Sequence, residues 1–594
     1  MKKLSFLLFF ILFSKIVISQ SIDTLKPEID YIKKHVEFLA SDSLKGRKPG
    51  TVESKIAAEY ILEQFKSNGL VPMGDKGFQY FNVVTDVKTG ENNYFSFNDF
   101  EGVLNNDFIP FSFSENKSVE ANVVFAGYGF DIKSDSITWN DYNDIVVKDK
   151  WVMILRGDPE LDNPNSIFIK YSIDRHKVLI AKDKGAAGVL LISGAEMEKK
   201  DELISLYYDQ TSGGAGVPVI NIKREVADKI LEESDKTIES LEKTLNTNKK
   251  PNSFDLEIKV KASSEIIKTY VQTQNVIAII EGNDPELKNE YIFIGAHYDH
   301  LGFGGQGTSS RKKDTVAVHN GADDNASGVA GVIELTKKLS LIKDDIKRSI
   351  VFMTFGAEEM GLLGSKYFVN NPLVEIDNIT TMFNFDMIGR LKPDNKTVTI
   401  GGSGTSEESD SLIMQFAKDR IFKVNLSPDG YGPSDHASFY ANDIPVFFIS
   451  TGAHEDYHTP EDDVDKLDFK GETAIIDFAY ELILNITNCD KKLTFSESGS
   501  KISYRHGRGL KIVLGIIPDF ASSEKNGLGV DGVKKGGPAD LGGMKKGDII
   551  IAINGQAVTN IYDYMYRLAN LKHGETAIVE VLRNEEKIVL LIQL

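Results

Sequence analysis

The sequence predicts an α/β fold in which a mostly parallel sheet is covered by helices. The main observation is that strand and helix signals alternate between about residues 270 and 490. Tyr291–Ala296 and Ser349–Phe355 are short apolar runs typical of buried strands, whereas Gly328–Leu339 and Ala474–Ile486 repeat apolar residues at helical spacing. In sheets of this kind, functional sites lie in the loops where the strands end.

Further elements extend the same pattern. Thr380–Phe385 and Pro445–Ser450 are strand-like, and Gly361–Phe368 and Leu412–Lys418 are helical. Two more helices are expected between residues 22 and about 80, because apolar residues recur there at helical spacing. The stretch Gly46–Gly50 contains glycine and proline and separates those two helices.

The length of 594 residues requires several domains, since a single hydrophobic core does not grow to that size. Short apolar runs between Gly and Asp turns indicate a strand-rich insert, and the last 85 or so residues read as a small domain of short strands and glycines. The predicted divisions are a signal peptide at 1–20, an N-terminal part of the main domain at 21–110, the insert at 111–262, the rest of the main domain at 263–495, a linker at 496–509 and the small domain at 510–594.

The net charge limits the partners that the chain is expected to have, and its N-terminal sequence indicates the compartment. A formal net charge of -19 argues against nucleic acid and anionic membranes as partners. Lys2 and Lys3 precede the apolar run Leu4–Phe13, and the small Ser19 offers a cleavage site, as in a signal peptide. The run is too short to span a bilayer comfortably, so we expect export to the periplasm or the extracellular space and no stable membrane span after cleavage.

Histidines and acidic residues cluster where the predicted strands end. A His-X-Asp or a Glu-Glu pair is individually more often structural, but five such features fall at strand ends and loops of one domain. Zinc accepts histidine nitrogen and carboxylate oxygen, and two histidines with three carboxylates suit two zinc ions that share one carboxylate. The candidate residues are His297, Asp299, Asp323, Asp324, Glu358, Glu359, Asp386 and His458.

These strings resemble the M28 zinc metallopeptidases, a family that contains dizinc aminopeptidases with an α/β sandwich fold. The resemblance spans nearly the whole chain outside the insert and the C-terminal domain. It is carried by His297-Tyr-Asp-His300, Gly321-Ala-Asp-Asp-Asn-Ala-Ser-Gly328, Phe355-Gly-Ala-Glu-Glu-Met-Gly361, Asn384-Phe-Asp-Met387, Ser434-Asp-His-Ala-Ser-Phe439, Asp456-Tyr-His-Thr-Pro460 and the early Leu44-Lys-Gly-Arg.

The resemblance implies two zinc ions per chain and a role for each matched residue. His297 and Asp386 would bind one zinc, Glu359 and His458 would bind the other, and Asp324 would bridge both, with a cis peptide to Asn325. Three further roles are catalytic: Asp299 would orient His297 through its second ring nitrogen, Glu358 would be the general base, and Tyr457 or Tyr431 would donate a hydrogen bond to the oxyanion.

The other histidines are expected outside the ligand positions, with one alternative, and metals other than zinc fit the same ligands. His300 is expected to hydrogen-bond locally, His436 to be structural, and His319 and His454 to lie near the site outside the ligand positions. His454 is the alternative to His458. Cobalt or manganese could occupy the same ligands in vitro.

The accessory domains resemble two known modules. The insert is similar to a protease-associated domain through Phe125-Ala-Gly-Tyr-Gly-Phe130 and Lys150-Trp-Val-Met-Ile-Leu-Arg-Gly157, and either shapes the substrate cleft or stabilises the chain. The C-terminal domain is similar to a PDZ domain. Its loop Leu514, Gly515, Ile516 would capture the carboxylate of a peptide C-terminus, or the domain would pack within the chain.

The predicted function is that of an exported aminopeptidase that releases N-terminal residues from peptides with a free N-terminus. The alternatives are a carboxypeptidase, a dipeptidase or a glutaminyl cyclase with the same metals, and a non-catalytic binding protein. A cyclase of this family typically works with one zinc, and an intact Glu358 argues against the loss of catalysis. Side-chain preference and oligomeric state do not follow from the sequence.

Overall fold

The computed structural model describes residues 27–594 except residues 135–136, 164, 210–212, 499–511 and 520–526. Contacts divide the chain into two compact units. One comprises the chain up to Val83 with Val271–Ser503, and the other comprises Val84–Tyr270 with Tyr504–Leu594. The predicted signal peptide and most of the predicted linker lie outside the described residues.

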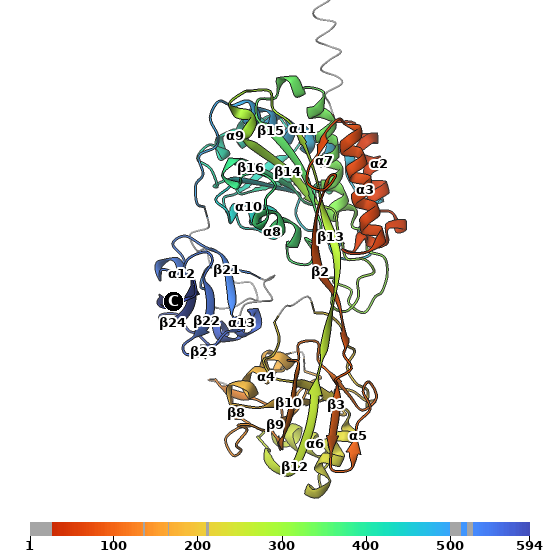
Figure 1. The fold of residues 1–594 in the computed structure, drawn as a ribbon, viewed down its shortest axis with the longest axis vertical. Helices are drawn as coiled ribbons and strands as arrows, with labels where there is room; N and C mark the ends of the chain where they lie inside the picture. The colour runs from red at the N-terminus through yellow and green to blue at the C-terminus, as the bar shows by residue number, and fades with distance from the viewer. Residues whose placement is uncertain (1–26, 135–136, 164, 210–212, 499–511, 520–526) are drawn as a thin grey trace, which may run out of the picture. The chain divides into compact units, whose positions relative to one another are not determined.

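A mixed, mostly parallel sheet forms the centre of the first unit, which confirms the predicted fold class (Figure 1). In sheet order the strands are β1 (Val71–Pro72), β13 (Ile266–Ile280), β15 (Ser349–Phe355), β14 (Tyr291–His297), β16 (Ile379–Phe385), β19 (Val446–Ser450), β17 (Thr397–Gly401) and β18 (Lys423–Ser427), with β2 (Phe78–Thr89) paired to β13. The central strands β15, β14, β16 and β19 run parallel, whereas β13 pairs antiparallel with β15 and β17 pairs antiparallel with β19.

Helices cover both faces of this sheet because successive strand residues point to opposite sides. On β14, Ile292 and Ile294 join the core on one face, and Phe293 joins the core on the other. The first face is covered by α2 (Ile29–Leu39), α3 (Val52–Ser67), α7 (Gly328–Ser340), α9 (Ser409–Ala417) and α11 (Phe469–Asn488), and the second by α8 (Leu363–Asn370) and α10 (His436–Tyr440).

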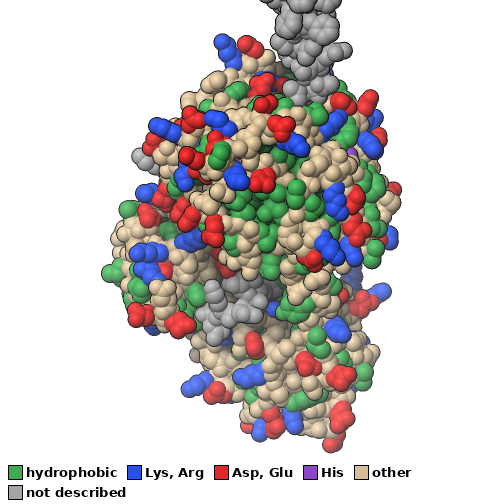
Figure 2. All heavy atoms as spheres, turned by 45° about the horizontal axis from the view of Figure 1, so that its top comes forward, with side chains coloured by type: hydrophobic (Ala, Val, Ile, Leu, Met, Phe, Trp, Pro, Cys, Tyr) green, Lys and Arg blue, Asp and Glu red, His purple; other side chains and the backbone are tan. Residues whose placement is uncertain are grey.

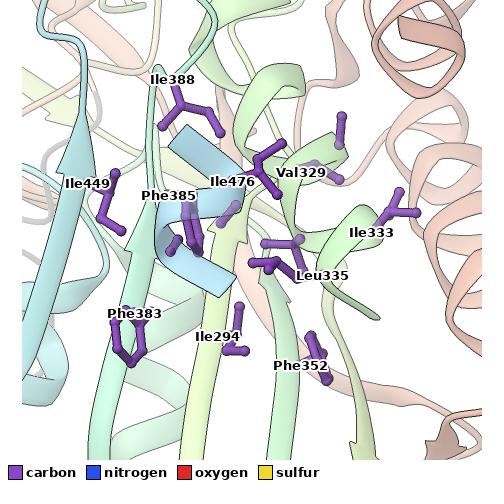
Figure 3. Packing of buried hydrophobic residues seen from close by; sticks show 14 of the residues in the cluster. Ile294, Val329, Ile333, Leu335, Phe352, Phe383, Phe385, Ile388, Ile449 and Ile476 are labelled. Atoms are coloured by element: carbon purple, nitrogen blue, oxygen red, sulfur yellow. The ribbon is translucent and has the colours of Figure 1, made fainter. Parts of the chain in front are cut away.

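Figure 3 shows the larger of these cores. It contains Phe352, Phe383 and Phe385 of the strands together with Val329 and Ile333 of α7, and all five side chains are fully buried. Burying each such side chain stabilises the fold by about 1.5–3 kcal/mol. Because the core is also closely packed, it is rigid, and it holds the strand ends that carry the loops in place.

The turn between α2 and α3 depends on a glycine. Gly46 has φ +69°, and a Cβ atom there would lie 2.5 Å from the carbonyl oxygens of Gly302 and His319. Both oxygens belong to the main chain, which cannot move aside as a flexible side chain can. The turn therefore packs directly against the loop that follows β14.

The second unit contains a β-rich insert, as predicted, but its sheet begins before residue 111. Tyr94–Phe97 pairs with β12 across more than 160 residues, for example Phe95 with Ala262, a partnership that local sequence patterns do not reveal. In sheet order the strands are β4 (Phe100–Glu101), β3 (Tyr94–Phe97), β12 (Phe254–Ser264), β6 (Lys117–Phe125), β9 (Trp151–Leu155), β10 (Gly188–Ile192), β11 (Val219–Ile222) and β5 (Phe108–Pro110). Its helices are α4 (Asp174–Asp183), α5 (Arg224–Leu231) and α6 (Ile238–Asn248).

The C-terminal domain is a small antiparallel sheet with two helices. Its described strands are β20 (Ile516–Pro518), β21 (Leu528–Val533), β22 (Ile549–Ile553), β23 (Gln556–Ala557), β24 (Thr576–Arg583) and β25 (Glu586–Gln593), and its helices are α12 (Pro538–Leu541) and α13 (Ile561–Ala569). Acidic and basic side chains are interspersed over the face shown in Figure 2. Across the described chain, no helix has the length and apolar character needed to cross a bilayer.

Replacing Gly46 by alanine should destabilise the first unit more than the same change at Gly69. Both glycines have positive φ and share a conformational penalty of about 1 kcal/mol, but a Cβ atom at Gly69 meets nothing within 4 Å. Overpacking at Gly46 adds about 1–3 kcal/mol. Differential scanning calorimetry of Gly46→Ala and Gly69→Ala compares the two, and equal shifts in Tm would contradict the packing argument.

Candidate metal centre

Three neighbouring parallel strands deliver the candidate ligands to one edge of the sheet. His297 is the last residue of β14, Asp386 follows β16 directly, and Glu358 and Glu359 follow β15 after a two-residue turn. The carboxyl ends of parallel strands meet at one edge, so these side chains converge although they are far apart in the sequence.

The first group of donors surrounds His297. Its Nε2 atom lies 3.2 Å from Asp324 Oδ1 and 3.7 Å from Asp386 Oδ1, and all three residues are buried. Two ligands that bind one tetrahedral zinc at about 2.0–2.1 Å lie about 3.3 Å from each other. The spacing of these donors therefore fits a shared metal ion.

The second group uses the other oxygen of the same aspartate. His458 Nε2 lies 3.1 Å from Asp324 Oδ2 and 3.2 Å from Glu359 Oε2. Asp324 thus presents Oδ1 to one group and Oδ2 to the other, which is the arrangement expected of a carboxylate that bridges two metal ions.

The negative charge around the two donor groups also favours the binding of cations. Burial acts to lower the pKa of His297, but the charge of Glu358 and the hydrogen bonds to Asp324 and Asp386 outweigh it and hold the pKa well above its usual value. Burial likewise opposes protonation of His458, yet Asp324 and Glu359 raise its pKa to about 10. The excess of buried carboxylates that draws protons to these histidines would also attract metal cations.

Main-chain hydrogen bonds hold the bridging aspartate in place. The buried Asp462 carboxylate accepts from the backbone N–H groups of Asp323 and Asp324 at 3.0–3.2 Å. The Asn325 side chain donates to the Phe385 carbonyl and accepts from Gly328 N–H. The peptide between Asp324 and Asn325 is cis, as the family resemblance implied.

Asp299 contacts the second ring nitrogen of His297, as predicted, and also has a role that was not predicted. Its carboxylate accepts from the backbone N–H groups of Glu358 at 3.0 Å and Glu359 at 3.3 Å. The ring atom His297 Nδ1 lies 3.2 Å from the Asp299 main-chain oxygen and 3.9 Å from its carboxylate. The carboxylate therefore fixes the turn that separates the two glutamates, and the main-chain oxygen orients the histidine.

Arg47 connects the N-terminal helices to the same loops. This fully buried side chain donates to the carbonyl oxygens of Tyr298, Asn320 and Gly321, and also to that of Leu39. It fixes both ends of the segment between the first histidine and the bridging aspartate. The string Leu44-Lys-Gly-Arg pointed to this region, but not to this contact.

The two candidate tyrosines lie in different surroundings. The Tyr457 ring stacks on His458 with centroids 3.8 Å apart, and burial together with Asp324 and Glu359 raises its pKa well above the usual value. Tyr431 packs edge-on against Tyr440. The charges that raise its pKa, after burial, come from residues outside both donor groups. Only Tyr457 is thus placed beside the donors.

His300 lies closer to the site than the sequence suggested. Its Nδ1 atom is 2.8 Å from Glu359 Oε1 and 4.0 Å from Asp324 Oδ2, so the second group has two histidines nearby. His454 Nε2 instead lies 3.3 Å from Asp323 Oδ2. The His436 ring stacks on Phe448.

Two residues near the donors had no distinct role in the sequence. His319 contacts Ser310 Oγ at 3.0 Å and so belongs to the loop after β14. Asp435 is fully buried, and burial raises its pKa to about 7. It stands in the matched string Ser434-Asp-His, the only sequence signal that could have identified it.

Family models match two parts of the chain. Residues 275–483 match the model described as Peptidase family M28. Residues 529–592 match the model of a PDZ domain. The first match contains every residue of the two donor groups.

Curated relatives share part of this region. Aminopeptidase YwaD of Bacillus subtilis (strain 168) is 24% identical over 298 residues, which are 48% of this chain and 54% of that protein. Leupeptin-inactivating enzyme 1 of Streptomyces exfoliatus is 33% identical over 184 residues, 30% of this chain and 36% of that protein. The chain thus spans about half or less of the length of these relatives.

Solved structures of similar chains include two aminopeptidases. The aminopeptidase from Aneurinibacillus sp. strain AM-1 is 21% identical, with a TM-score of 0.44, and the match covers 81% of this chain and 97% of that one. BSAP, a zinc aminopeptidase from Bacillus subtilis, is 20% identical, with a TM-score of 0.46, and the match covers 77% and 95%.

Replacing Asp462 by asparagine should weaken metal binding although Asp462 belongs to neither donor group. An amide NH2 would face one of the two backbone N–H groups that the carboxylate now accepts, and the Asp324 loop would shift. Loss of such outer support typically costs 10–100-fold in metal affinity. Metal analysis of Asp462→Asn beside the exposed control Asp465→Asn tests this, and equal metal contents would contradict it.

Proposed function

We propose that this chain, whose residues 275–483 are a domain of peptidase family M28, is an aminopeptidase that works with two zinc ions. The observation that carries the proposal is the division of the Asp324 carboxylate, with Oδ1 beside His297 and Oδ2 beside His458. The relatives named aminopeptidases agree with it.

Five residues would hold the metals. His297 and Asp386 would hold one zinc, Glu359 and His458 the other, and Asp324 both. His458 is preferred to His300 because its Nε2 atom lies at nearly equal distances from Asp324 and Glu359, whereas His300 lies within hydrogen-bond distance of Glu359 alone. When bound, the two ions supply Lewis acidity to the attacking water and the scissile carbonyl.

Glu358 is the proposed general base. Its side chain is 10% exposed and lies beside His297, with Oε2 4.0 Å from Nδ1, and it belongs to neither donor group. Because Asp299 holds the backbone at both glutamates, Glu358 and Glu359 can point to different partners. Glu358 would take a proton from the attacking water and deliver it to the leaving amine nitrogen.

Tyr457 is the proposed oxyanion donor. Its stacking on His458 places the ring beside the second donor group, and the raised pKa keeps the hydroxyl protonated. A neutral O–H in a partly buried site can donate to the oxygen on which negative charge develops.

The names of the curated relatives favour an aminopeptidase over a carboxypeptidase. Aminopeptidase YwaD matches 298 residues of this chain. The carboxylates of the site do not decide between the two, because Asp324, Glu359 and Asp386 would be neutralised by the two zinc ions. A carboxypeptidase would need a basic group to bind the substrate C-terminus. We therefore retain the aminopeptidase ahead of the carboxypeptidase, dipeptidase and cyclase alternatives.

Export and peptide capture complete the proposal. The basic and apolar pattern of residues 1–20 supports export to the periplasm or the extracellular space. Leu514 is fully buried, and Gly515, with φ +80°, accepts from Lys534 N–H, which shapes the loop before β20. Such a loop can bind a peptide C-terminus while the peptide pairs with a sheet edge.

Peptides with a free N-terminus should be hydrolysed, and N-acetylated peptides of the same sequence should not. A panel of aminoacyl chromogenic substrates, with matched N-blocked and C-terminal-release peptides, measures this with and without chelator and added zinc. Chelator-resistant release, or activity on blocked substrates only, would overturn the proposed function.

Glu358→Gln and Asp324→Ala should fail for different reasons. The first removes the base but no ligand, so zinc content should stay near that of the natural chain while kcat falls about 10²–10⁴-fold. The second removes the bridge, so both zinc and activity should be lost. Zinc analysis together with kinetics separates them, and full zinc occupancy in Asp324→Ala would refute the bridging role.

A further inference from the structure

The segment of residues 302–319 forms a closed loop between the end of β14 and the loop of Asp324. Gly302 N–H donates to the Gly46 carbonyl, and His319 N–H donates back to the Gly302 carbonyl. Ala317 N–H donates to the Phe303 carbonyl, so the two arms of the loop pair with each other. Both ends of the loop are therefore fixed to the body of the first unit.

The tip of this loop reaches the second donor group. Ser309 Oγ donates to Glu359 Oε2 at 3.1 Å. The main-chain oxygen of the same residue lies 3.1 Å from His458 Nδ1. Ser309 thus contacts two of the proposed ligands, one through its side chain and one through its backbone.

The contact with His458 decides which ring nitrogen is available. A carbonyl oxygen can only accept, so His458 Nδ1 must carry the hydrogen. In the neutral ring, Nε2 is then left with its lone pair, and it is the atom that faces Asp324 and Glu359. Ser309 therefore sets both the orientation and the tautomer of this ligand.

Neighbouring residues fasten the tip to the segment that carries His458. Arg311 N–H donates to the His458 carbonyl at 3.0 Å, and the Arg311 guanidinium donates to the Glu455 carbonyl at 3.0 Å. Lys312 pairs with Glu461. The loop and the histidine segment consequently hold one another in position.

A purely local role does not account for the Ser309 hydroxyl. The adjacent Thr308 hydroxyl donates to Gly305, within the loop itself, as turn-forming residues commonly do. Ser309 instead reaches across 50 residues of sequence to a carboxylate. Together with His300 on Oε1, it gives each oxygen of Glu359 one hydrogen-bond donor.

We infer that Ser309 is a positioning residue for metal binding, which acts by holding Glu359 and His458 in the geometry that the second zinc requires. The inference rests on the proposed function, because it assumes that these two residues are ligands. The loop of residues 302–319 would thus complete the second donor group, which contains Glu359 and His458.

Zinc titration of the metal-free full-length chain against a competing chromophoric chelator tests this inference. In Ser309→Ala, the apparent affinity for the second zinc should fall about 10–100-fold, as is usual when a ligand loses its outer hydrogen bond, while the first zinc binds as before. Ser309→Thr, which keeps the hydroxyl, should bind both ions nearly as the natural chain does. The control Thr308→Val removes a hydroxyl from the same loop and should change neither affinity.

Thermal melting of the metal-free forms shows whether Ser309→Ala merely destabilises the loop, and equal Tm values are expected. Unchanged affinity for both ions in Ser309→Ala, or an equal loss in Thr308→Val, would overturn the inference. If the natural chain binds two zinc ions but hydrolyses no peptide, the proposed function fails and the titration still decides the role of Ser309. A natural chain that binds no zinc would overturn both.

Discussion

The concentration of buried carboxylates around Asp324 is the constraint on which the rest of the structure depends. Glu358, Glu359 and Asp386 share its pocket, and a buried charge is costly unless it is paired or hydrogen-bonded. The chain supplies two kinds of compensation. Asp299 and Asp462, which are also buried, accept from backbone N–H groups, whereas the remaining carboxylates face histidines. Asp324, Glu359 and Asp386 form the two donor groups with His297 and His458, and their concentrated negative charge would attract cations.

The backbone-bound carboxylates also explain how adjacent residues acquire separate tasks. Asp299 binds consecutive N–H groups at Glu358 and Glu359, and Asp462 does the same at Asp323 and Asp324. In each case an acidic pair lies where the chain turns, and the turn aims one member at a metal-binding position. Arg47 performs a related task with its donors, since it binds the carbonyl groups on either side of the loop that joins these segments.

The sequence alone predicted the sheet, the strand-end clustering and the two accessory domains, because these follow from local periodicity and from motifs. It could not predict contacts that depend on tertiary pairing. Asp462 meets Asp323 across 139 residues, and Arg47 meets Asn320 across 273 residues. The bonds of the Asp299 carboxylate were missed for the same reason, since its partners lie in the turn that follows β15. The early start of the insert likewise depends on the pairing of β3 with β12.

The two halves of the metal centre differ in how they are built. His297 is the last residue of one central strand and Asp386 follows another, so their backbones share the rigidity of the packed sheet. Glu359 and His458 lie in loops, and His458 has φ +57°, a left-handed conformation that is uncommon for residues other than glycine. The first half is therefore preorganised by the fold itself. The second half depends on His300, Ser309 and Arg311 to hold it. More conformational freedom would be lost when a cation binds there, so its affinity is the more sensitive of the two to sequence changes outside the ligand set.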